Sequence, residues 1–280
     1  MLVVQTIPEL RAAIAQARAQ GRSIGFVPTM GCLHAGHLAL IARARQAATF
    51  TVVSIFVNPT QFGPNEDFSR YPRTFAADSA ACQVAGADLI FAPIPADFYP
   101  AGASTWVDVA AVTTGLCGEF RPGHFRGVAT VVAMLLNAVQ ADVAVFGQKD
   151  LQQLAAIRRM VRDLHFPVRI IAHETVREAN GVAMSSRNRY LSPEDFQRAT
   201  AIPAALAVAR SLVQTGETAA AKVAAAVNTR LAAEPALLVQ YLAIVDRETM
   251  AAVTVIRPGQ TALAIACHLG PTRLIDNTEL

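Results

Sequence analysis

The sequence predicts an α/β protein with a doubly wound parallel (Rossmann-like) sheet, followed by a second, smaller α+β C-terminal domain. Two observations support this prediction. Between residue 20 and about residue 172, short apolar runs of strand length alternate with amphipathic helical patterns, as in parallel strands joined by right-handed crossovers. Beyond residue 192 come two alanine-rich helical patterns and two runs of alternating polarity, which indicate a small antiparallel sheet. We place the boundary at residue 175, giving domains 1–175 and 176–280.

The elements of the first domain follow from hydrophobic period and turn-forming residues. Pro8 is acceptable in the first turn of the opening helix, and Gly86 ends a later helix. β-branched and aromatic residues mark the buried strands. In chain order, we expect a helix over 7–19, a strand over 23–27, a helix to about 48, a strand over 50–57, a helix over 74–85, strands over 88–92 and 105–109, a helix over 128–139, a strand over 142–146, a helix from about 151 to 161, and a strand over 168–172.

The second domain begins with a clear helix start. Ser192 can be an N-cap, with Pro193 at the first helical position. We expect helices over about 193–214 and 217–233, and strands over 239–245 and 261–268.

Composition excludes several classes of protein. The chain has 280 residues, 53% of them hydrophobic, which is ample for a large core. Its net charge of +3 comes without a basic tract, so we predict no nucleic-acid surface. No apolar run reaches the roughly 18 residues of a membrane span, and the opening segment, with Glu9, does not resemble a secretory signal. The four cysteines are scattered without metal-site spacing, so we expect reduced thiols and a cytoplasmic protein.

The segment from Phe26 to Leu38 reads as a buried strand, a tight turn and a helix start. Gly31 and Gly36 remove side chains where the phosphates of a ligand need the backbone close. His34 and His37 are three residues apart, so both can project from one face of the helix. A helix N-terminus also offers unpaired N–H groups and a partial positive charge, so the turn suits a polyphosphate whose charge rises in a transition state.

Two other interpretations of this turn remain open from spacing alone. The two histidines could be half of a zinc site, although no cysteine cluster lies nearby to complete it. They could also be polar capping residues. His34-Ala35-Gly36-His37 resembles the His-x-Gly-His signature of the nucleotidyl-transferring α/β superfamily, which includes the class I aminoacyl-tRNA synthetases. This resemblance implies ATP bound against the turn and chemistry at its α-phosphate.

A second strand-to-helix turn is Gly147-Gln148-Lys149-Asp150. Only two of the 24 basic residues are lysines, and Lys149 is one of them. Its ammonium group can reach a phosphate, and Asp150 could hold the water shell of a metal ion. Gln153 lies one turn into the following helix and faces back toward this turn.

Three loops offer further candidate ligands. Asn58 and Gln61 follow the strand over 50–57, and their amides suit a small ligand with hydroxyls and a carboxylate, although Asn-Pro is also an ordinary turn. Arg121, His124 and Arg126 precede the apolar helix, where they would favour an anionic ligand or be simply solvent-exposed. The irregular segment 177–188 could close over a triphosphate or serve as a domain linker.

Five motifs together resemble the pantoate–β-alanine ligase (pantothenate synthetase) family, over the whole chain. They are Pro28-Thr29-Met30-Gly31 with His34 and His37, Phe56 to Phe62, Arg121-Pro122-Gly123-His124-Phe125, Gly147 to Asp150 with Gln152-Gln153, and Met184-Ser185-Ser186-Arg187-Asn188. The family joins (R)-pantoate to β-alanine with ATP, giving pantothenate, AMP and pyrophosphate, and the resemblance implies a homodimer.

The resemblance also implies the site residues. Pantoate would meet Gln61 and Gln153, and β-alanine would meet Gln61, while His37 would be the catalytic proton donor. Cys32 and Leu151 depart from the residues expected at their positions, which are often polar and aromatic respectively. ATP would contact Met30, Gly31, Cys32, Leu33, His34, Ala35, Gly36, His37, Gly147, Gln148, Lys149, Asp150, Val176, Met184, Ser185, Ser186 and Arg187.

Chemical reasoning agrees with this assignment. A carboxylate is a poor electrophile, so amide formation requires attack of pantoate on the α-phosphorus and an acyl-adenylate intermediate. We expect His34, His37, Lys149 and Arg187, with Mg²⁺, to stabilise the developing negative charge. Two competing functions are a nucleotidyltransferase acting on a phosphate acceptor, and a nucleotide-binding regulator without catalysis.

Overall fold

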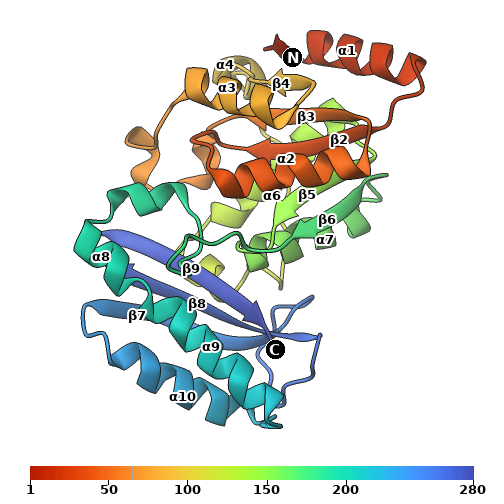
Figure 1. Ribbon diagram of the computed structural model, residues 1–280. Helices are drawn as coiled ribbons and strands as arrows, with labels where there is room; N and C mark the ends of the chain where they lie inside the picture. The colour runs from red at the N-terminus through yellow and green to blue at the C-terminus, as the bar shows by residue number, and fades with distance from the viewer. Residues whose placement is uncertain (65) are drawn as a thin grey trace. The chain divides into compact units, whose positions relative to one another are not determined.

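The computed structural model describes residues 1–64 and 66–280, and these form two compact units (Figure 1). The first unit contains residues 1–109, 121–148 and 156–174. The second contains residues 110–120, 149–155 and 175–280. The chain therefore contributes two short internal segments to the second unit before its C-terminal third.

A six-stranded parallel sheet forms the centre of the first unit. Its order is β1-β4-β3-β2-β5-β6, and Phe26 of the central strand pairs with Val52 on one side and Ala144 on the other. The chain thus winds outward from β2 in one direction through β3 and β4, and in the other through β5 and β6, which confirms the predicted doubly wound sheet. The strands are β1 (Leu2–Val4), β2 (Ile24–Thr29), β3 (Phe50–Ile55), β4 (Leu89–Phe91), β5 (Val143–Gly147) and β6 (Arg169–His173).

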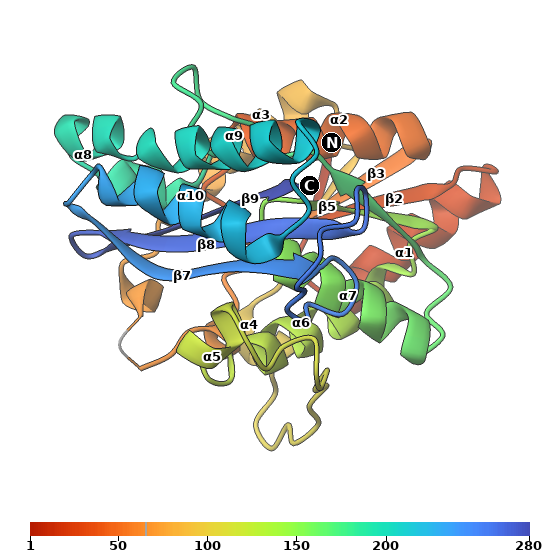
Figure 2. The same cartoon turned by 90° about the horizontal axis from the view of Figure 1, so that it is seen from below.

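Helices cover both faces of this sheet. On one face α2 (Ala35–Ala47) and α3 (Phe75–Ala85) bury Ile41, Ala44 and Cys82 against Val27 and Val53. Figure 2 shows α6 (His124–Val139) on the other side of the strands, where it packs against α1 (Ile7–Ala19). Right-handed crossovers produce this division, because strands added in opposite directions send their helices to opposite faces.

Local sequence explains where these helices begin and end. The Thr6 side chain accepts the backbone N–H of Glu9, and the Glu9 carboxylate accepts the N–H of Thr6, which forms a capping box before the predicted helix over 7–19. Gly86 ends α3 with a left-handed backbone at φ +81°, as the sequence predicted.

The second unit contains the smaller antiparallel sheet. Its strands are β7 (Leu237–Asp246), β8 (Thr261–Leu269) and β9 (Thr272–Glu279), paired in that order. Helices α9 (Ala201–Gln214) and α10 (Ala220–Ala232) pack on each other and on this sheet. Leu206, Val223 and Leu231 of the helices and Leu263 and Ile265 of β8 form its core, all 1% exposed or less. The predicted α+β composition of the C-terminal region is confirmed.

The expected single helix over 193–214 is wrong. It is two helices, α8 (Pro193–Arg198) and α9, separated at Ala199 and Thr200. Pro203 explains the break, because it has no N–H to donate to the carbonyl of Ala199 and its ring would collide with that carbonyl in a continuous helix. Ser192 caps α8 as predicted, accepting the N–H of Asp195 at 3.0 Å.

The expected strand over 105–109 is also wrong. This segment joins neither of the sheets that the described residues form, and Val107 instead donates its N–H to the Thr130 hydroxyl at 2.9 Å. The sequence analysis predicted neither β9 of the second unit nor β1 of the first, which pairs with β4 through Leu2 and Leu89 and so occupies that edge of the sheet.

The remaining elements are short except for α7 (Leu151–Asp163), whose residues are divided between the two units. They are η1 (Pro59–Gln61), η2 (Asp67–Ser69), α4 (Pro95–Phe98), α5 (Cys117–Phe120), α7 and η3 (Ser186–Tyr190). Among the residues described, no helix has the length and apolar character needed to cross a membrane.

Candidate active site

The carboxyl ends of β2 and β5 carry two of the predicted turns. The two strands are neighbours in the sheet, pairing through Gly25 and Val143, and the chain leaves them in opposite directions. This is the topological switch point, where doubly wound sheets bind their ligands. Met30 follows β2 directly, and Gly147 is the last residue of β5. The first unit therefore places Met30 and Gly147, the residues with which these turns begin, at the edge of the sheet where a ligand is expected.

The histidine turn is capped by its own imidazole rings. His34 is the N-cap of α2, and its Nδ1 accepts the N–H of Gly36 at 3.2 Å. The Nδ1 of His37 accepts the N–H of His34 at 3.3 Å, and the two ring centroids are 4.1 Å apart. A ring nitrogen that accepts a hydrogen bond carries no proton, so both rings are neutral with the proton on Nε2. Both rings therefore cap the start of the helix, and the Nε2–H of each ring is a donor.

A buried carboxylate that the sequence analysis did not single out holds this turn. Asp78 of α3 is 3% exposed and accepts the backbone N–H groups of Cys32 at 3.0 Å and Leu33 at 2.8 Å. Cys32 has a left-handed backbone at φ +51°, and Gly31 precedes it at φ +79°. A Cβ on Gly31 would lie 2.9 Å from the Asp78 carboxylate, so this glycine is needed both for its φ and for the close approach.

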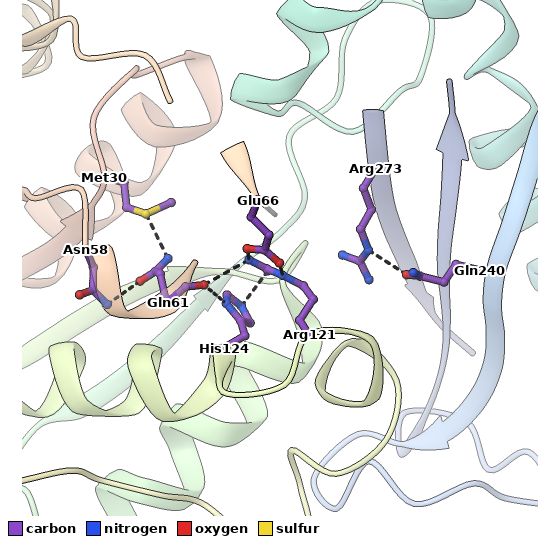
Figure 3. Close-up of polar contacts among 8 residues, drawn as sticks. All are labelled: Met30, Asn58, Gln61, Glu66, Arg121, His124, Gln240 and Arg273. Carbon is purple, nitrogen blue, oxygen red and sulfur yellow. Dashed lines mark hydrogen bonds and ion pairs between the residues drawn. The ribbon is translucent and has the colours of Figure 1, made fainter. Parts of the chain in front are cut away.

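Asn58 and Gln61 lie together, and their amides are bonded to each other (Figure 3). The Asn58 Nδ2 group donates to Gln61 Oε1 at 3.0 Å and to the carbonyl of Gly127 at 3.1 Å. The Tyr99 hydroxyl donates to Asn58 Oδ1 at 3.0 Å, and Asn58 is only 1% exposed. Asn58 therefore orients Gln61 and has no surface to offer a ligand in this structure.

The Gln61 amide has a weaker partner on its other side. Its Nε2 donates to the thioether sulfur of Met30 at 3.0 Å. Sulfur is a poor acceptor, so a carboxylate or hydroxyl oxygen would form a stronger hydrogen bond with the same N–H. Gly127 allows the backbone of residues 60 and 61 to lie close to α6, because a Cβ at Gly127 would lie 2.3 Å from the carbonyl oxygen of Thr60.

Arg121 is not a solvent-exposed arginine, which was one of the two interpretations of its loop. Its side chain is 15% exposed, and its Nε and Nη2 groups donate to the two oxygens of Glu66 at 2.6 Å each. Burial alone would raise the pKa of Glu66, but the hydrogen bonds and charge of Arg121 outweigh burial and hold that pKa below its ordinary value. In this structure the guanidinium is paired with an acid of its own chain.

In the second unit, the turn at Lys149 is held by the last strand. Asn277 of β9 donates its Nδ2–H to the carbonyl of Lys149 at 2.8 Å. Gln152, 6% exposed, donates to the carbonyls of Val112 at 3.0 Å and Gly115 at 2.8 Å. Gln153 is partly buried in the first turn of α7. The start of α7 is therefore fixed from two sides within the second unit.

The predicted residues from 176 to 187 also lie together in the second unit. Met184 donates its N–H to the carbonyl of Val176 at 2.9 Å. Ser185 caps η3, its hydroxyl accepting the N–H of Arg187 at 3.3 Å. Ahead of them Arg177 pairs with the two oxygens of Asp276, which is 4% exposed, at 2.7 and 3.0 Å. These contacts order the backbone that carries Ser186 and Arg187.

Comparison with known proteins identifies the family. The profile described as pantoate-beta-alanine ligase matches residues 2–279. The chain belongs to the pantoate–β-alanine ligase family. The family resemblance predicted from the five motifs is thus confirmed, and with it the prediction of a ligase.

Individual relatives in the family are similar over their whole length. The pantothenate synthetase of Moorella thermoacetica is 51% identical over 280 residues, covering 100% of this chain and 99% of the relative. Pantothenate synthetase 1 of Bradyrhizobium diazoefficiens is 52% identical over 280 residues, covering 100% and 98%.

Solved structures agree with the family assignment. The crystal structure of pantothenate synthetase from Thermus thermophilus has a TM-score of 0.95 at 48% identity and covers 100% of this chain and 99% of its own. The Francisella tularensis pantoate-beta-alanine ligase, complexed with beta-gamma ATP and beta-alanine, has a TM-score of 0.79 at 30% identity, covering 100% and 97%. These neighbours support the predicted fold class.

Proposed function

We propose that this protein condenses (R)-pantoate with β-alanine at the expense of ATP, through a pantoyl-adenylate intermediate, giving pantothenate, AMP and pyrophosphate. The observation that carries the proposal is the pair of Nε2–H donors at the start of α2, beside the switch point of the sheet. Two neutral donors on a helix N-terminus suit an anion that gains charge during a reaction. The ATP and β-alanine in the Francisella relative support the same substrates here.

The reaction has two steps. A carboxylate oxygen of pantoate attacks the α-phosphorus of ATP, the bond to the β-phosphate oxygen breaks, and pyrophosphate leaves. The amine of β-alanine then attacks the acyl carbon, AMP leaves with the carbon–oxygen bond electrons, and the amine loses a proton. No nucleophile of the protein is needed, so its residues bind, orient and stabilise charge.

We assign the charge-stabilising roles to four residues. His37 donates its Nε2–H to phosphate oxygens, with His34 beside it, and neither acts as a base, because Nδ1 is occupied by a backbone N–H. Lys149 and Arg187 supply full positive charges to the triphosphate. Further ATP contacts are proposed at Met30, Gly31, Cys32, Leu33, Ala35, Gly36, Gly147, Gln148, Asp150, Val176, Met184, Ser185 and Ser186.

Gln61 and Gln153 are the proposed pantoate ligands, and Gln61 also meets β-alanine. The Gln61 N–H that now rests on the Met30 sulfur is the group that a substrate oxygen would take. Asn58 was predicted as a third ligand, but its amide is committed to Gln61 and Gly127, so we assign it to orienting Gln61.

Mg²⁺ is expected to accompany ATP. Within residues 1–64 and 66–280 no three His, Cys, Asp or Glu side chains are grouped as a metal cage. The chain therefore fits Mg²⁺ only as an ion held mainly by phosphate oxygens, with Asp150 as the proposed carboxylate through water. When bound, the ion would neutralise part of the phosphate charge.

We also propose a homodimer in the cytoplasm, as the family resemblance implies. The four cysteines are all buried free thiols, which is compatible with a reducing compartment.

The decisive experiment supplies ATP and pantoate without β-alanine and measures exchange of labelled pyrophosphate into ATP. We expect exchange that depends on pantoate, and AMP and pantothenate once β-alanine is added. A nucleotidyltransferase would instead need a phosphate acceptor and ignore β-alanine. A regulator would bind ATP and form no AMP, and either result would overturn the proposal.

A further inference from the structure

The backbone of Gln61 is gripped by two side chains from the loop before α6. The Nδ1 of His124 lies 2.8 Å from the Gln61 carbonyl oxygen, and the Nη2 of Arg121 lies 3.3 Å from the same atom (Figure 3). A carbonyl oxygen can accept two hydrogen bonds, so both contacts form together.

The partners of His124 fix its protonation state. The third contact, between Arg121 Nη1 and His124 Nε2 at 3.0 Å, has only one possible donor, because a guanidinium cannot accept a hydrogen bond. His124 Nε2 is therefore unprotonated, and the proton lies on Nδ1, where it is donated to the Gln61 carbonyl. Arg121 selects the tautomer that Gln61 needs.

Glu66 fixes Arg121 in turn. Its two carboxylate oxygens receive Arg121 Nε and Nη2 in a two-pronged ion pair at 2.6 Å each. This geometry suits a planar guanidinium and holds it in one orientation. These contacts connect four residues: Glu66 holds Arg121, Arg121 contacts His124, and Arg121 and His124 both contact the Gln61 carbonyl.

The Gln61 side chain is oriented independently by Asn58, which leaves its Nε2–H on the Met30 sulfur. With the carbonyl held at one end and the amide at the other, Gln61 has little freedom left. Such restriction lowers the entropy that a ligand must remove on binding.

We propose that Arg121 and His124 are positioning residues that hold Gln61 for the acid substrate, with Glu66 orienting Arg121. This inference rests on the proposed function for the substrate, but not for the contacts themselves. It also assigns Arg121 and His124 of this loop to Gln61 instead of to an anionic ligand.

Two substitutions of His124 separate the hydrogen bond to the Gln61 carbonyl from the space that the side chain fills. His124→Asn keeps an amide N–H near the Nδ1 position, whereas His124→Gln places its amide near Nε2. We expect His124→Gln to raise the KM for pantoate about tenfold through the loss of one hydrogen bond, with the KM for ATP unchanged and the melting temperature lowered by a few degrees. His124→Asn should stay within about threefold of wild type. His165→Gln, at an exposed histidine away from this set, is the matched control.

Equal effects of His124→Asn and His124→Gln on the KM for pantoate would overturn the inference, and so would a rise in the KM for ATP alone. Nitrogen-15 spectra of the wild-type histidine rings give a test that needs no turnover. The expected result is a neutral His124 ring protonated at Nδ1, and a ring protonated at Nε2 would contradict the inference. Absence of pantoate-dependent exchange in the wild type would instead count against the proposed function, and the spectra would still decide the contacts.

Discussion

His34 and His37 hold one turn of backbone between them. The ring of His34 accepts the N–H of Gly36, the ring of His37 accepts the N–H of His34, and the ring centroids are 4.1 Å apart. Each ring therefore has a structural nitrogen and a second nitrogen that carries a proton. Substitution can test the two nitrogens separately, because the amide of an asparagine lies near the Nδ1 position and the amide of a glutamine lies near the Nε2 position.

Substitutions of His37 should separate its cap from its chemistry. His37→Ala should reduce pyrophosphate exchange by about 10² or more, the usual loss for one charge-stabilising donor. His37→Asn, whose carbonyl can replace Nδ1 as the acceptor for His34, should restore stability without activity. His37→Gln should restore part of the activity, because its amide N–H lies near the Nε2 position. Near wild-type exchange in His37→Ala would refute the assigned role.

Asp78 should affect ATP binding although it contacts only backbone in the histidine turn. Asp78→Asn replaces one acceptor oxygen by an N–H₂ group facing the N–H groups of Cys32 and Leu33, so the turn must move. We expect the KM for ATP to rise about tenfold, from the loss of about one hydrogen bond in the turn's alignment.

The control for this variant is Asp88→Asn in the same unit. Asp88 also accepts a backbone N–H, from Thr51 at 2.8 Å, and pairs with Arg22 at 2.8 Å, but at the amino end of the strands. It should lower the melting temperature and leave the KM for ATP unchanged. If both variants raise the KM for ATP equally, Asp78 has no special relation to the turn.

The sequence was sufficient for elements that depend on local pattern. Alternation of apolar runs with helical patterns predicted the parallel sheet, and the glycines and histidines between Gly31 and His37 predicted the turn at its switch point. Ser192 and Gly86 act within one helical turn, so their roles could be read directly. The Pro203 break is equally local and was open to prediction, because a proline interrupts the helical hydrogen bond to the residue four positions before it. The β1 edge was missed because this three-residue strand is defined by its pairing with β4 across the sheet.

Residues that act through long-range backbone contacts were not predictable. Asp78 is 46 positions from Cys32, and an acid in the first turn of a helix reads as a partner of the helix dipole. Asn277 lies 128 positions from Lys149, in a segment whose Asp-Asn pair interrupts the alternation typical of a strand. Asn58 was predicted as a ligand because the sequence shows that the residue carries an amide but not that this amide is buried.

Lys149 and Asn277 should behave as one functional unit. Lys149→Ala should cut pyrophosphate exchange by about 10² or more, because it removes a charge from the triphosphate. Asn277→Ala should raise the KM for ATP about tenfold, since the carbonyl of Lys149 loses its partner.

The double variant tests the connection between these two residues. If Asn277 acts by placing Lys149, adding Asn277→Ala to Lys149→Ala costs little more. Fully multiplicative losses would contradict that connection. Asn228→Ala, on the exposed surface of α10, is the matched control for the substitution itself.

The stability of the protein should fall in alkali. Burial, and then the charge of Asp78, raises the pKa of the Cys82 thiol to about 11, and burial raises the pKa of Cys267 to about 12. Burial likewise raises the pKa of Tyr241 to about 12. Unfolded thiols ionise near their ordinary pKa of about 8.5. The unfolded state therefore releases protons first, and stability that is fully present below about pH 8.5 is lost as the pH rises toward 12.

Denaturant unfolding at pH 7, 9 and 10.5 measures this loss for the wild type and for Cys82→Ala and Cys267→Ala. At pH 7 neither state ionises a thiol, so the difference between variant and wild type reports lost packing alone. Between pH 9 and 10.5 each variant should lose less stability than the wild type, because one thiol no longer favours the unfolded state. Parallel curves for variants and wild type over that range would show that the buried thiols do not govern the alkaline transition.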